Sequence, residues 1–300
     1  MSLRILITGS TGLIGSAIAD ALADGDFEIV ALYRYNKNPS LQQAHWIHCD
    51  MEKIDNGFFD SLPKVDAIIH NAAMIPSPGV EPNEQLMDAV NHAFSSKLFH
   101  WAHSTNVSRI IFTSTYSFLK KPLPEVITEN SEVDPIGIYP ASKWKAEKEL
   151  MSLRSETTSG IALRIPSPVA ISLINAPKNV ARNWIETARQ GKNLHVFGNG
   201  LRTMDFVSVG DIAQAFLKAL SADITQNEIF NIGSGTTLSM QELALQIATA
   251  FGVSVEYSGT DINANDRWNI DIKKGKTMLG YNPSCTAAEA IQLLIDNSKK

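Results

Sequence analysis

Short apolar runs alternate with helix-forming segments through the first half of the chain. Residues 4–8 form one such run, and residues 16–23 then place apolar side chains at the spacing of a helix. Further runs occupy residues 27–33, 65–70, 108–115 and 161–165, and a shorter one ends at residues 48–50. Continuous apolar runs are typical of strands that are buried on both faces. The alternation predicts an α/β fold, a doubly wound parallel sheet with helices on both faces, through about residue 166.

A glycine-rich turn joins the first predicted strand to the first predicted helix. Strand, turn and helix in this order form the context of dinucleotide binding, and the helix N-terminus presents free N–H groups to an anion. Gly9 permits the tight turn, Gly12 lets the backbone approach a pyrophosphate, and Gly15 lets the helix pack close to the strand. The predicted cofactor-binding residues of this turn are Gly9, Ser10, Thr11, Gly12, Leu13, Ile14 and Gly15.

The end of the second predicted strand indicates which dinucleotide is preferred. NAD sites usually carry an acidic residue there to hold the ribose hydroxyls, but this chain has Tyr33 followed by Arg34. An arginine suits a 2′-phosphate, so NADP is favoured over NAD, with a solvated surface arginine as the alternative. Asp50, after the third strand, is a candidate acceptor for the adenine amino group, and the small residues Ala72 and Ala73 would let the backbone lie against the cofactor.

Tyr139 and Lys143 are one helical turn apart, so both side chains lie on one face of a predicted helix. A lysine ammonium beside a tyrosine hydroxyl favours the phenolate and lowers its pKa, which predicts a proton-transfer group that works near neutral pH. A surface helix start is the alternative for the isolated pair. Thr115 places a hydroxyl at the end of the predicted fifth strand. The alternative role for this hydroxyl is to cap the strand end.

Taken together, these motifs resemble the extended short-chain dehydrogenase/reductase family, also called NAD(P)-dependent epimerase/dehydratases. The resemblance is carried by Gly9-x-x-Gly12-x-x-Gly15, His70-Asn-Ala-Ala73, Thr113-Ser-Thr115, Tyr139-x-x-x-Lys143, Asp205-Phe-Val-Ser-Val-Gly-Asp211, Phe230-Asn-Ile-Gly-Ser-Gly235 and Leu279-Gly-Tyr-Asn-Pro283. It implies a Rossmann-type dinucleotide-binding domain over residues 1–166, to which residues 206–232 return. A smaller, interleaved substrate-binding lobe would comprise residues 167–205 and 233–300.

The resemblance also implies roles for individual residues. Tyr139 would be the acid/base, Lys143 would lower its pKa and hold the nicotinamide ribose, and Thr115 would hydrogen-bond the substrate oxygen. Further cofactor contacts would come from Arg34, Asp50, Met51, Asn71, Ala72, Ala73, Asn91, Tyr139, Lys143 and Ile165. Substrate contacts would come from Thr115, Ser167, Arg202 and Arg267, where each arginine is equally readable as a surface charge. A homodimer is expected through helices near residues 82–103 and 141–154.

The segment from Val196 to Asp205 resembles that of nucleotide-sugar enzymes, which favours a nucleotide sugar as substrate. The chain departs from the pattern at Met204, where relatives often have arginine, and at Ser167, where many have asparagine. An epimerase that passes through a transient 4-keto intermediate is the main prediction, and a keto-sugar reductase that exchanges NADP is the alternative. A dehydratase is disfavoured because Tyr116-Ser117, rather than Asp-Glu, follows Thr115. A non-catalytic redox sensor is a third possibility, although such relatives typically lack the Tyr–Lys pair.

The composition narrows the classes of protein and of partner that fit this chain. The 300 residues are 44% hydrophobic and 19% charged, as in an ordinary globular protein large enough for one big or two interlocked domains. The net charge of −5 argues against nucleic acid or an anionic membrane as partner. Two cysteines provide no disulfide framework and fit a cytoplasmic location. No signal peptide, membrane-spanning stretch or metal-ligand spacing is expected from the pattern.

Overall fold

A seven-stranded parallel sheet forms the centre of the computed structural model, which describes residues 2–55, 57–76, 79–171 and 179–299. The strand order is β11-β6-β5-β4-β1-β2-β3, and every neighbouring pair is parallel. The strands are β1 (Leu3–Thr8), β2 (Phe27–Tyr33), β3 (His45–His48), β4 (Ala67–His70), β5 (Arg109–Thr115), β6 (Ser159–Ile165) and β11 (Glu228–Asn231). The predicted fold class, an α/β Rossmann-type sheet, is confirmed.

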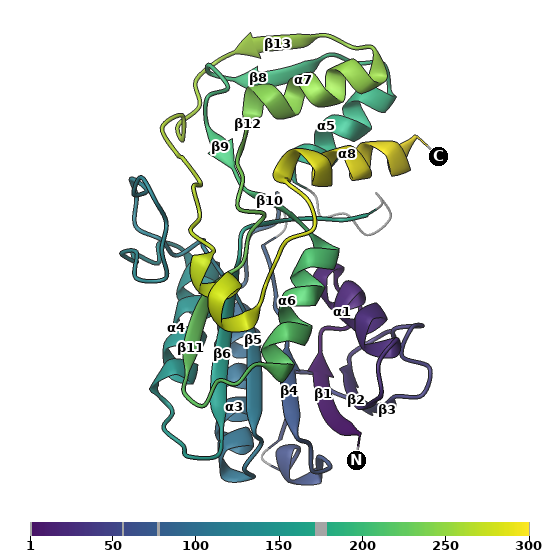
Figure 1. The fold of residues 1–300 in the computed structure, drawn as a ribbon, viewed down its shortest axis with the longest axis vertical. Helices are drawn as coiled ribbons and strands as arrows, with labels where there is room; N and C mark the ends of the chain where they lie inside the picture. The colour runs from purple at the N-terminus through teal and green to yellow at the C-terminus, as the bar shows by residue number, and fades with distance from the viewer. Residues whose placement is uncertain (1, 56, 77–78, 172–178, 300) are drawn as a thin grey trace.

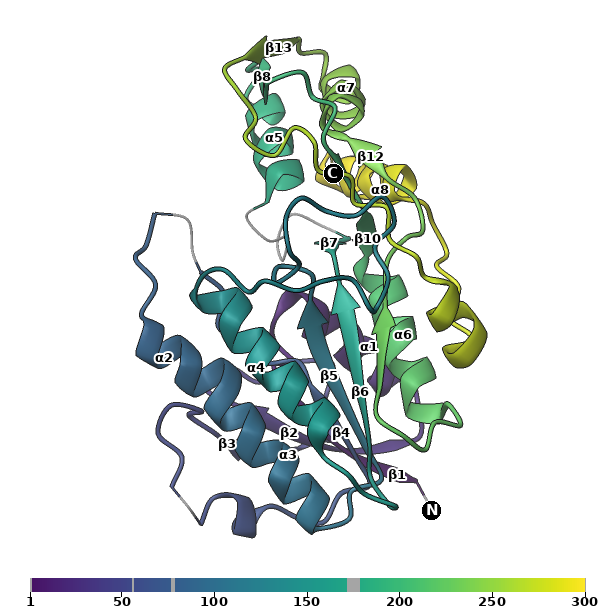
Figure 2. The ribbon, with the colours of Figure 1, turned by 90° about the vertical axis from the view of Figure 1, so that its left-hand side faces the viewer.

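Helices cover both faces of this sheet (Figure 2). One face carries α1 (Leu13–Ala23) and α6 (Val209–Ser221), and the other carries α3 (Phe94–Ser104) and α4 (Ile138–Ser152). A short helix, α2 (Glu84–Asp88), leads into α3 through a π-helical turn (Ala89–Ala93). Because successive strand side chains point to opposite faces, Ile5 and Ile7 pack in the first core and Leu6 packs in the second. The continuous apolar runs of the sequence arise from this burial on both faces.

A second, smaller body lies above the carboxyl ends of the strands (Figure 1). In the part of the chain that the structure describes, it contains three helices, α5 (Val180–Arg189), α7 (Met240–Phe251) and α8 (Ala287–Ser298). Three strand pairs accompany them: β7 (Ser167–Val169) with β10 (Phe206–Ser208), β8 (Leu194–Phe197) with β13 (Val255–Ser258), and β9 (Thr203–Met204) with β12 (Leu238–Ser239). Its helices share a hydrophobic core separate from the two beside the sheet. No helix in the described part of the chain is long and apolar enough to span a membrane.

The C-terminal region does not stay in the upper body. Residues 270–281 come back to the lower half, where a π-helical turn (Gly275–Leu279) packs against α6. Ile272, Leu279 and Tyr281 are buried in the same core as α1 and α6. The sequence places the return to the sheet near residues 206–230, but β10 pairs only with β7, and β11 is the strand that joins the sheet. The proposed domain boundaries stay a prediction, and this packing adds a second return of the chain from the upper body to the lower half.

Candidate active site

A cavity of about 510 Å³ opens at the carboxyl ends of the central strands, where ligands bind in sheets of this kind. It extends from the glycine-rich turn before α1 to the start of α4. Fourteen of the predicted site residues line it: Gly9, Thr11, Gly12, Leu13, Ile14, Arg34, Met51, Asn71, Ala72, Ala73, Thr115, Tyr139, Lys143 and Ile165. The topology therefore gathers in one place residues that are more than 150 positions apart in the chain.

The glycine-rich turn fits a bound phosphate group. Gly9 has a φ of +70°, and a Cβ there would lie 2.7 Å from the Ala72 backbone. A Cβ at Gly15 would lie 1.9 Å from the Gly9 carbonyl oxygen, so α1 packs directly against the turn. Gly12 is the N-cap of α1 and supplies no side-chain cap. The first-turn N–H groups of α1 are therefore available to an anion, as a dinucleotide pyrophosphate requires.

The far end of the cavity, at the ends of β2 and β3, carries the residues that the sequence assigns to the adenine and its ribose. Arg34 lines the cavity, is exposed, and holds its guanidinium carbon 4.5 Å from the Tyr35 ring centroid. Asp50 is not among the lining residues, and its carboxylate lies 3.8 Å from the Lys53 ammonium. Its neighbour Cys49 faces the cavity instead. The adenine contact assigned to Asp50 stays a prediction.

Hydrogen bonds fix the middle of the cavity wall. The Asn71 amide donates to the Gly9 carbonyl at 3.3 Å and accepts from the Thr113 hydroxyl at 2.9 Å. Asn91 lies behind this wall and does not line it. Its side chain accepts from the Met74 backbone N–H at 2.7 Å and donates to the Met74 carbonyl at 2.9 Å. The structure therefore indicates that Asn91 shapes the loop after β4 rather than touching the cavity.

Two other predicted residues of the glycine turn are also internal. Ser10 is 1% exposed, and its hydroxyl has no hydrogen-bond partner within the described residues. Its carbonyl accepts a hydrogen bond from the buried Asn38 side chain at 2.5 Å. Gly15 is buried between the helix and the turn. Both residues shape the turn from behind, while their neighbours face the cavity.

Tyr139, Lys143 and Thr115 meet at the opposite end of the cavity. Tyr139 lies in the first turn of α4, Lys143 follows one turn later, and Thr115 ends β5. A hydrogen bond joins the Tyr139 and Thr115 side chains. The Thr115 hydroxyl also accepts from the Ser117 N–H at 3.1 Å. The Lys143 ammonium lies 3.9 Å from the centroid of the Phe112 ring, and the lysine is 2% exposed.

The pKa values at this end differ from the sequence-based expectation. Burial raises the pKa of Tyr139 to about 12, and the hydrogen bond with Thr115 opposes that rise only partly. Burial lowers the pKa of Lys143 to about 7, against the carboxylate of Glu147. The expectation that Lys143 lowers the pKa of Tyr139 is thus not met in this structure, because removal from water penalises both charged forms. Burial thus favours the neutral form of both side chains.

The residues assigned to the substrate are not brought together. Ser167 begins β7 between Pro166 and Pro168, which line the cavity. Arg202 is part of an ion pair, with its Nε atom 3.1 Å from the Asp261 carboxylate. Arg267 donates to the carbonyls of Ala264 at 2.9 Å and Asp266 at 3.0 Å. Neither arginine lines the cavity, so a diphosphate contact from either one stays a prediction.

Several lining residues are not among the predicted site residues, although Tyr33 ends the second predicted strand and Thr113 and Ser114 belong to the Thr113-Ser-Thr115 motif. They are Leu32, Tyr33, Cys49, Met74, Ile75, Val90, Thr113, Ser114, Pro166 and Pro168. Most are apolar residues that read as ordinary core or loop positions. The prolines after β6 are the exception, since a break in the pattern directly after a buried strand marks the strand's carboxyl end.

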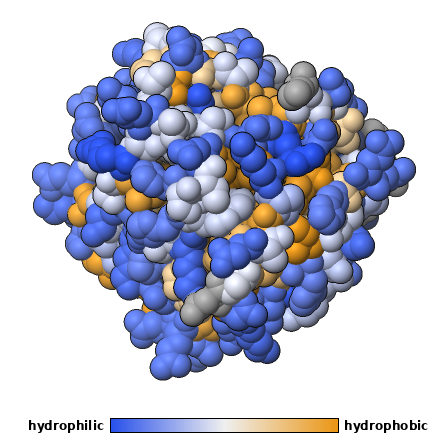
Figure 3. Space-filling model, turned by 90° about the horizontal axis from the view of Figure 1, so that it is seen from below, coloured by the Kyte–Doolittle hydropathy of each residue, from blue (hydrophilic) through white to orange (hydrophobic). Residues whose placement is uncertain are grey.

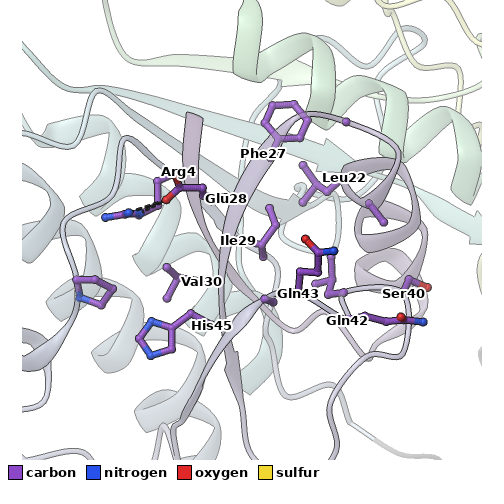
Figure 4. Close-up of a pocket in the computed structure, with 15 residues that line it drawn as sticks. Arg4, Leu22, Phe27, Glu28, Ile29, Val30, Ser40, Gln42, Gln43 and His45 are labelled. Atoms are coloured by element: carbon purple, nitrogen blue, oxygen red, sulfur yellow. Dashed lines mark hydrogen bonds and ion pairs between the residues drawn. The ribbon is translucent and has the colours of Figure 1, made fainter. Parts of the chain in front are cut away.

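A second cavity, of about 680 Å³, lies at the amino-terminal end of the sheet beside β2 (Figure 4). Its wall includes an ion pair between Arg4 and Glu28, and none of the predicted site residues line it. Figure 3 shows the molecule from this end, where hydrophilic side chains divide the exposed hydrophobic ones into patches. The chemistry-bearing residues therefore gather at the other end of the strands.

Asp205, in the segment that enters β10, gives a test of pH-dependent stability. Burial raises its pKa from 3.8 to about 6, although Ser234 and Gly235 hydrogen-bond it. Because the folded state holds this proton more tightly, stability is lost as the pH rises from about 4 to 6, by roughly 3 kcal/mol. Asp205→Asn removes the ionisation, so urea unfolding should find the variant gaining stability over the wild type across that range. An equal difference at pH 4 and pH 7 would contradict this.

Comparisons with known proteins agree with this geometry. Residues 5–233 match the model of the NAD dependent epimerase/dehydratase family. A putative UDP-glucose 4-epimerase of Methanocaldococcus jannaschii is 28% identical over 97% of both chains. The solved structure of the Thermotoga maritima UDP-glucose 4-epimerase with UDP-glucose has a TM-score of 0.84 at 23% identity and covers 98% of both chains. That of a Bacillus cereus UDP-glucuronic acid 4-epimerase with UDP-glucuronic acid and NAD has a TM-score of 0.83 at 20% identity, covering 99% of both. The chain belongs to the NAD dependent epimerase/dehydratase family.

Proposed function

We propose that this protein is a 4-epimerase of a nucleotide sugar that uses a nicotinamide dinucleotide. The hydrogen bond between Tyr139 and Thr115, beside Lys143 and in the same cavity as the glycine-rich turn, carries the proposal. It places a proton-transfer group and an anion-binding turn in one cavity. Two relatives that match this chain over nearly their whole length are named as a putative UDP-glucose 4-epimerase and a UDP-glucose 4-epimerase. These names support a UDP-sugar as the substrate class.

The proposed chemistry depends on moving one proton at a defined atom. The bound dinucleotide supplies the acceptor and donor of a hydride. In its phenolate form, Tyr139 Oη would take the proton of the sugar 4-hydroxyl as the C4 hydrogen leaves with its electron pair, which produces a ketone. After the sugar turns over, Tyr139 returns the proton to the same oxygen as the hydride returns to the other face of C4. Substrate and product have the same composition, so no net oxidant is consumed.

The neighbouring side chains orient and tune this step. Thr115 shares a hydrogen bond with Tyr139 and would hold the substrate oxygen in line with it. Lys143, when charged, would favour the Tyr139 phenolate electrostatically and would donate to the nicotinamide ribose. The burial that raises the pKa of Tyr139 also strengthens the influence of any neighbouring charge.

A keto-sugar reductase is the second candidate, because Arg34 lines the cavity and its guanidinium would suit the 2′-phosphate of NADP. A labelling experiment separates the two reactions. The protein is incubated with UDP-glucose that carries deuterium at C4 and with catalytic amounts of dinucleotide. We expect a C4 epimer that keeps the deuterium, with no net change in absorbance of the reduced cofactor. Failure to form an epimer from UDP-glucose, UDP-N-acetylglucosamine or UDP-glucuronic acid, together with stoichiometric NADPH consumption on a 4-keto sugar nucleotide, would establish the reductase instead. Binding of the dinucleotide without either reaction would leave the non-catalytic redox sensor as the remaining function.

Arg34→Ala tests the preference between the two dinucleotides. The exposed guanidinium of Arg34 is available to a 2′-phosphate, and a charge-assisted contact of this kind is worth about 1.5–3 kcal/mol. We therefore expect the variant to lose about tenfold or more in affinity for NADP and less than about twofold for NAD. Calorimetric titration of both dinucleotides into both proteins measures this. Equal losses for the two would show that Arg34 does not read the 2′-phosphate.

We also propose a homodimer that pairs α3 and α4 with those of a second copy. Lys145 on α4 is bonded to Asp88 on α2 at 2.9 Å, and Glu149 on α4 accepts from Ser96 on α3 at 2.7 Å, so α2, α3 and α4 present one braced surface. Sedimentation velocity at working concentration should give a species of about twice the chain mass of 32.8 kDa. A single species at the chain mass would refute the dimer.

A further inference from the structure

A buried ion pair lies directly behind the proton-transfer site. Glu147 on α4 is 0% exposed and Arg164 on β6 is 2% exposed. The Arg164 Nη2 atom donates to Glu147 Oε1 at 2.6 Å, and its Nε lies 3.2 Å from both carboxylate oxygens. The remaining Nη1 donates to the Glu129 carbonyl at 2.9 Å. A pair that is desolvated this fully costs much to bury, and an apolar pair of the same volume would often be as stable.

The pair is tied to the strands that carry the site. Ser114 donates its hydroxyl hydrogen bond to Glu147 Oε2, and Ser114 stands directly before Thr115 on β5. In the sheet, Ser114 is the partner of Arg164, and Thr115 is the partner of Ile165. Glu147 therefore contacts both strands at the level where Thr115 and Ile165 line the cavity. A shift of α4 along the sheet would break the contacts of Glu147 with Ser114 and with Arg164 together.

The same carboxylate is placed to act on Lys143. Tyr139, Lys143 and Glu147 are spaced by four residues, so they lie along one face of α4. Among the described residues, His70 on β4 is the other ionisable group that interacts with Lys143, while the guanidinium of Arg164 on β6 is bonded to Glu147. On β5, the Phe112 ring lies 3.9 Å from the Lys143 ammonium. Burial holds the pKa of His70 at about 3, so its ring is neutral. Within the described residues, Glu147 is the neighbour that raises the pKa of Lys143.

We infer that Glu147 is a positioning residue, which locks α4 to β5 and β6 through Ser114 and Arg164 and provides the carboxylate that keeps Lys143 charged. This inference rests on the proposed function for its catalytic consequence. Its physical content does not, because the charge on Lys143 can be measured in the protein alone. The arrangement also explains why a costly ion pair is buried where hydrophobic packing would serve stability equally well.

The test is a pH titration of Lys143 followed by NMR. The protein is labelled with ¹³C at lysine Cε, the Lys143 signal is assigned by its loss in Lys143→Met, and the wild type is compared with Glu147→Gln between about pH 5 and 10. Glutamine keeps hydrogen-bonding atoms towards Ser114 and Arg164 but removes the charge, so we expect the Lys143 midpoint to fall by about one pH unit or more. Glu147→Asp, which restores a carboxylate, should recover part of that shift.

Two variants keep the result interpretable. Glu149→Gln is the matched control, since its carboxylate is on the opposite side of α4, bonded to Ser96, and it should leave the Lys143 midpoint unchanged. If Glu147→Gln does not fold, Glu147→Asp takes its place, and its shorter side chain, which moves the carboxylate, should lower the midpoint by a smaller amount. An unchanged midpoint in either protein that carries the Glu147 substitution overturns the inference.

Kinetics then separate positioning from plain stability. With UDP-glucose, or with whichever sugar nucleotide proves to be the substrate, Glu147→Gln should lower kcat about tenfold with KM within about twofold. The alkaline limb of the kcat profile should move to lower pH together with the NMR midpoint. A lower melting temperature with an unchanged pH profile would show that the pair only stabilises the fold. A shifted midpoint in a protein without any epimerase activity would instead leave the inference standing and reject the proposed function.

Discussion

Tyr139→Phe should reduce epimerase turnover by about 1,000-fold while leaving dinucleotide affinity within about twofold. Phenylalanine keeps the ring that packs at the start of α4 and removes only the oxygen that shares a hydrogen bond with Thr115. Tyr139 is the group to which the proposed mechanism assigns the proton of the sugar hydroxyl, so the variant lacks the base of that step. Steady-state kinetics with a coupled assay for the product epimer, and calorimetry for the dinucleotide, measure the two quantities separately.

The control for this variant is Tyr257→Phe. Tyr257 lies on β13 in the upper body, is 46% exposed, and does not line the cavity. It should keep full turnover. Tyr139→Phe with turnover near the wild-type value would reject Tyr139 as the proton-transfer group, and with it the mechanism proposed above. A loss of both turnover and dinucleotide affinity would point to a folding defect, which thermal unfolding would reveal.

Gly15→Ala should cost about 3 kcal/mol or more of folding stability, because its new Cβ would lie 1.9 Å from the Gly9 carbonyl oxygen. Backbone atoms cannot give way as a flexible side chain can, so α1 has to move off the turn. Gly12→Ala, three residues earlier, is the contrasting variant. Its Cβ would lie 3.4 Å from the same oxygen, and its φ of −75° suits alanine.

The two glycines should therefore fail in different ways. Gly12→Ala should unfold in urea within about 1 kcal/mol of the wild type, yet bind dinucleotide at least about tenfold more weakly, because the methyl group occupies the approach of the pyrophosphate. Gly15→Ala should lose stability first. If Gly15→Ala is as stable as the wild type, the close packing of α1 on the turn does not depend on a glycine at this position. If Gly12→Ala binds normally, the pyrophosphate does not lie against it.

The fold was largely predictable because the strands are buried on both faces. A run such as Ile5-Leu6-Ile7 sends alternate side chains into two different cores, so it is apolar throughout and easy to recognise. The pairing of β7 with β10 was not predictable, since each strand has only three residues and no periodicity can be read from them. The return of Tyr281 to the core beside α6 depends on contacts with residues far away in sequence.

The site was predictable where strand ends fix position, and less so where charge depends on three-dimensional neighbours. Thr115 and Lys143 come together because β5 and α4 are adjacent, which the alternation implies. The sequence gives no sign that Arg202 is taken up by Asp261, which is 59 positions later in the chain. It also cannot show that burial raises the pKa of Tyr139, because the spacing of Tyr139 and Lys143 is the same whether or not water surrounds them.

The second return of the chain to the lower half, through residues 270–281, limits how this protein can be altered by recombination. A C-terminal block exchanged with a relative at residue 166 would carry away β11, the strand that pairs with the outer edge of β6. It would also carry away residues 270–281, which fill the core beside α6. The upper body therefore cannot be exchanged as a self-contained unit. New sugar specificity is more readily introduced by exchanging short loops above the cavity. Such an exchange leaves β11 at the edge of the sheet and residues 270–281 in the core intact.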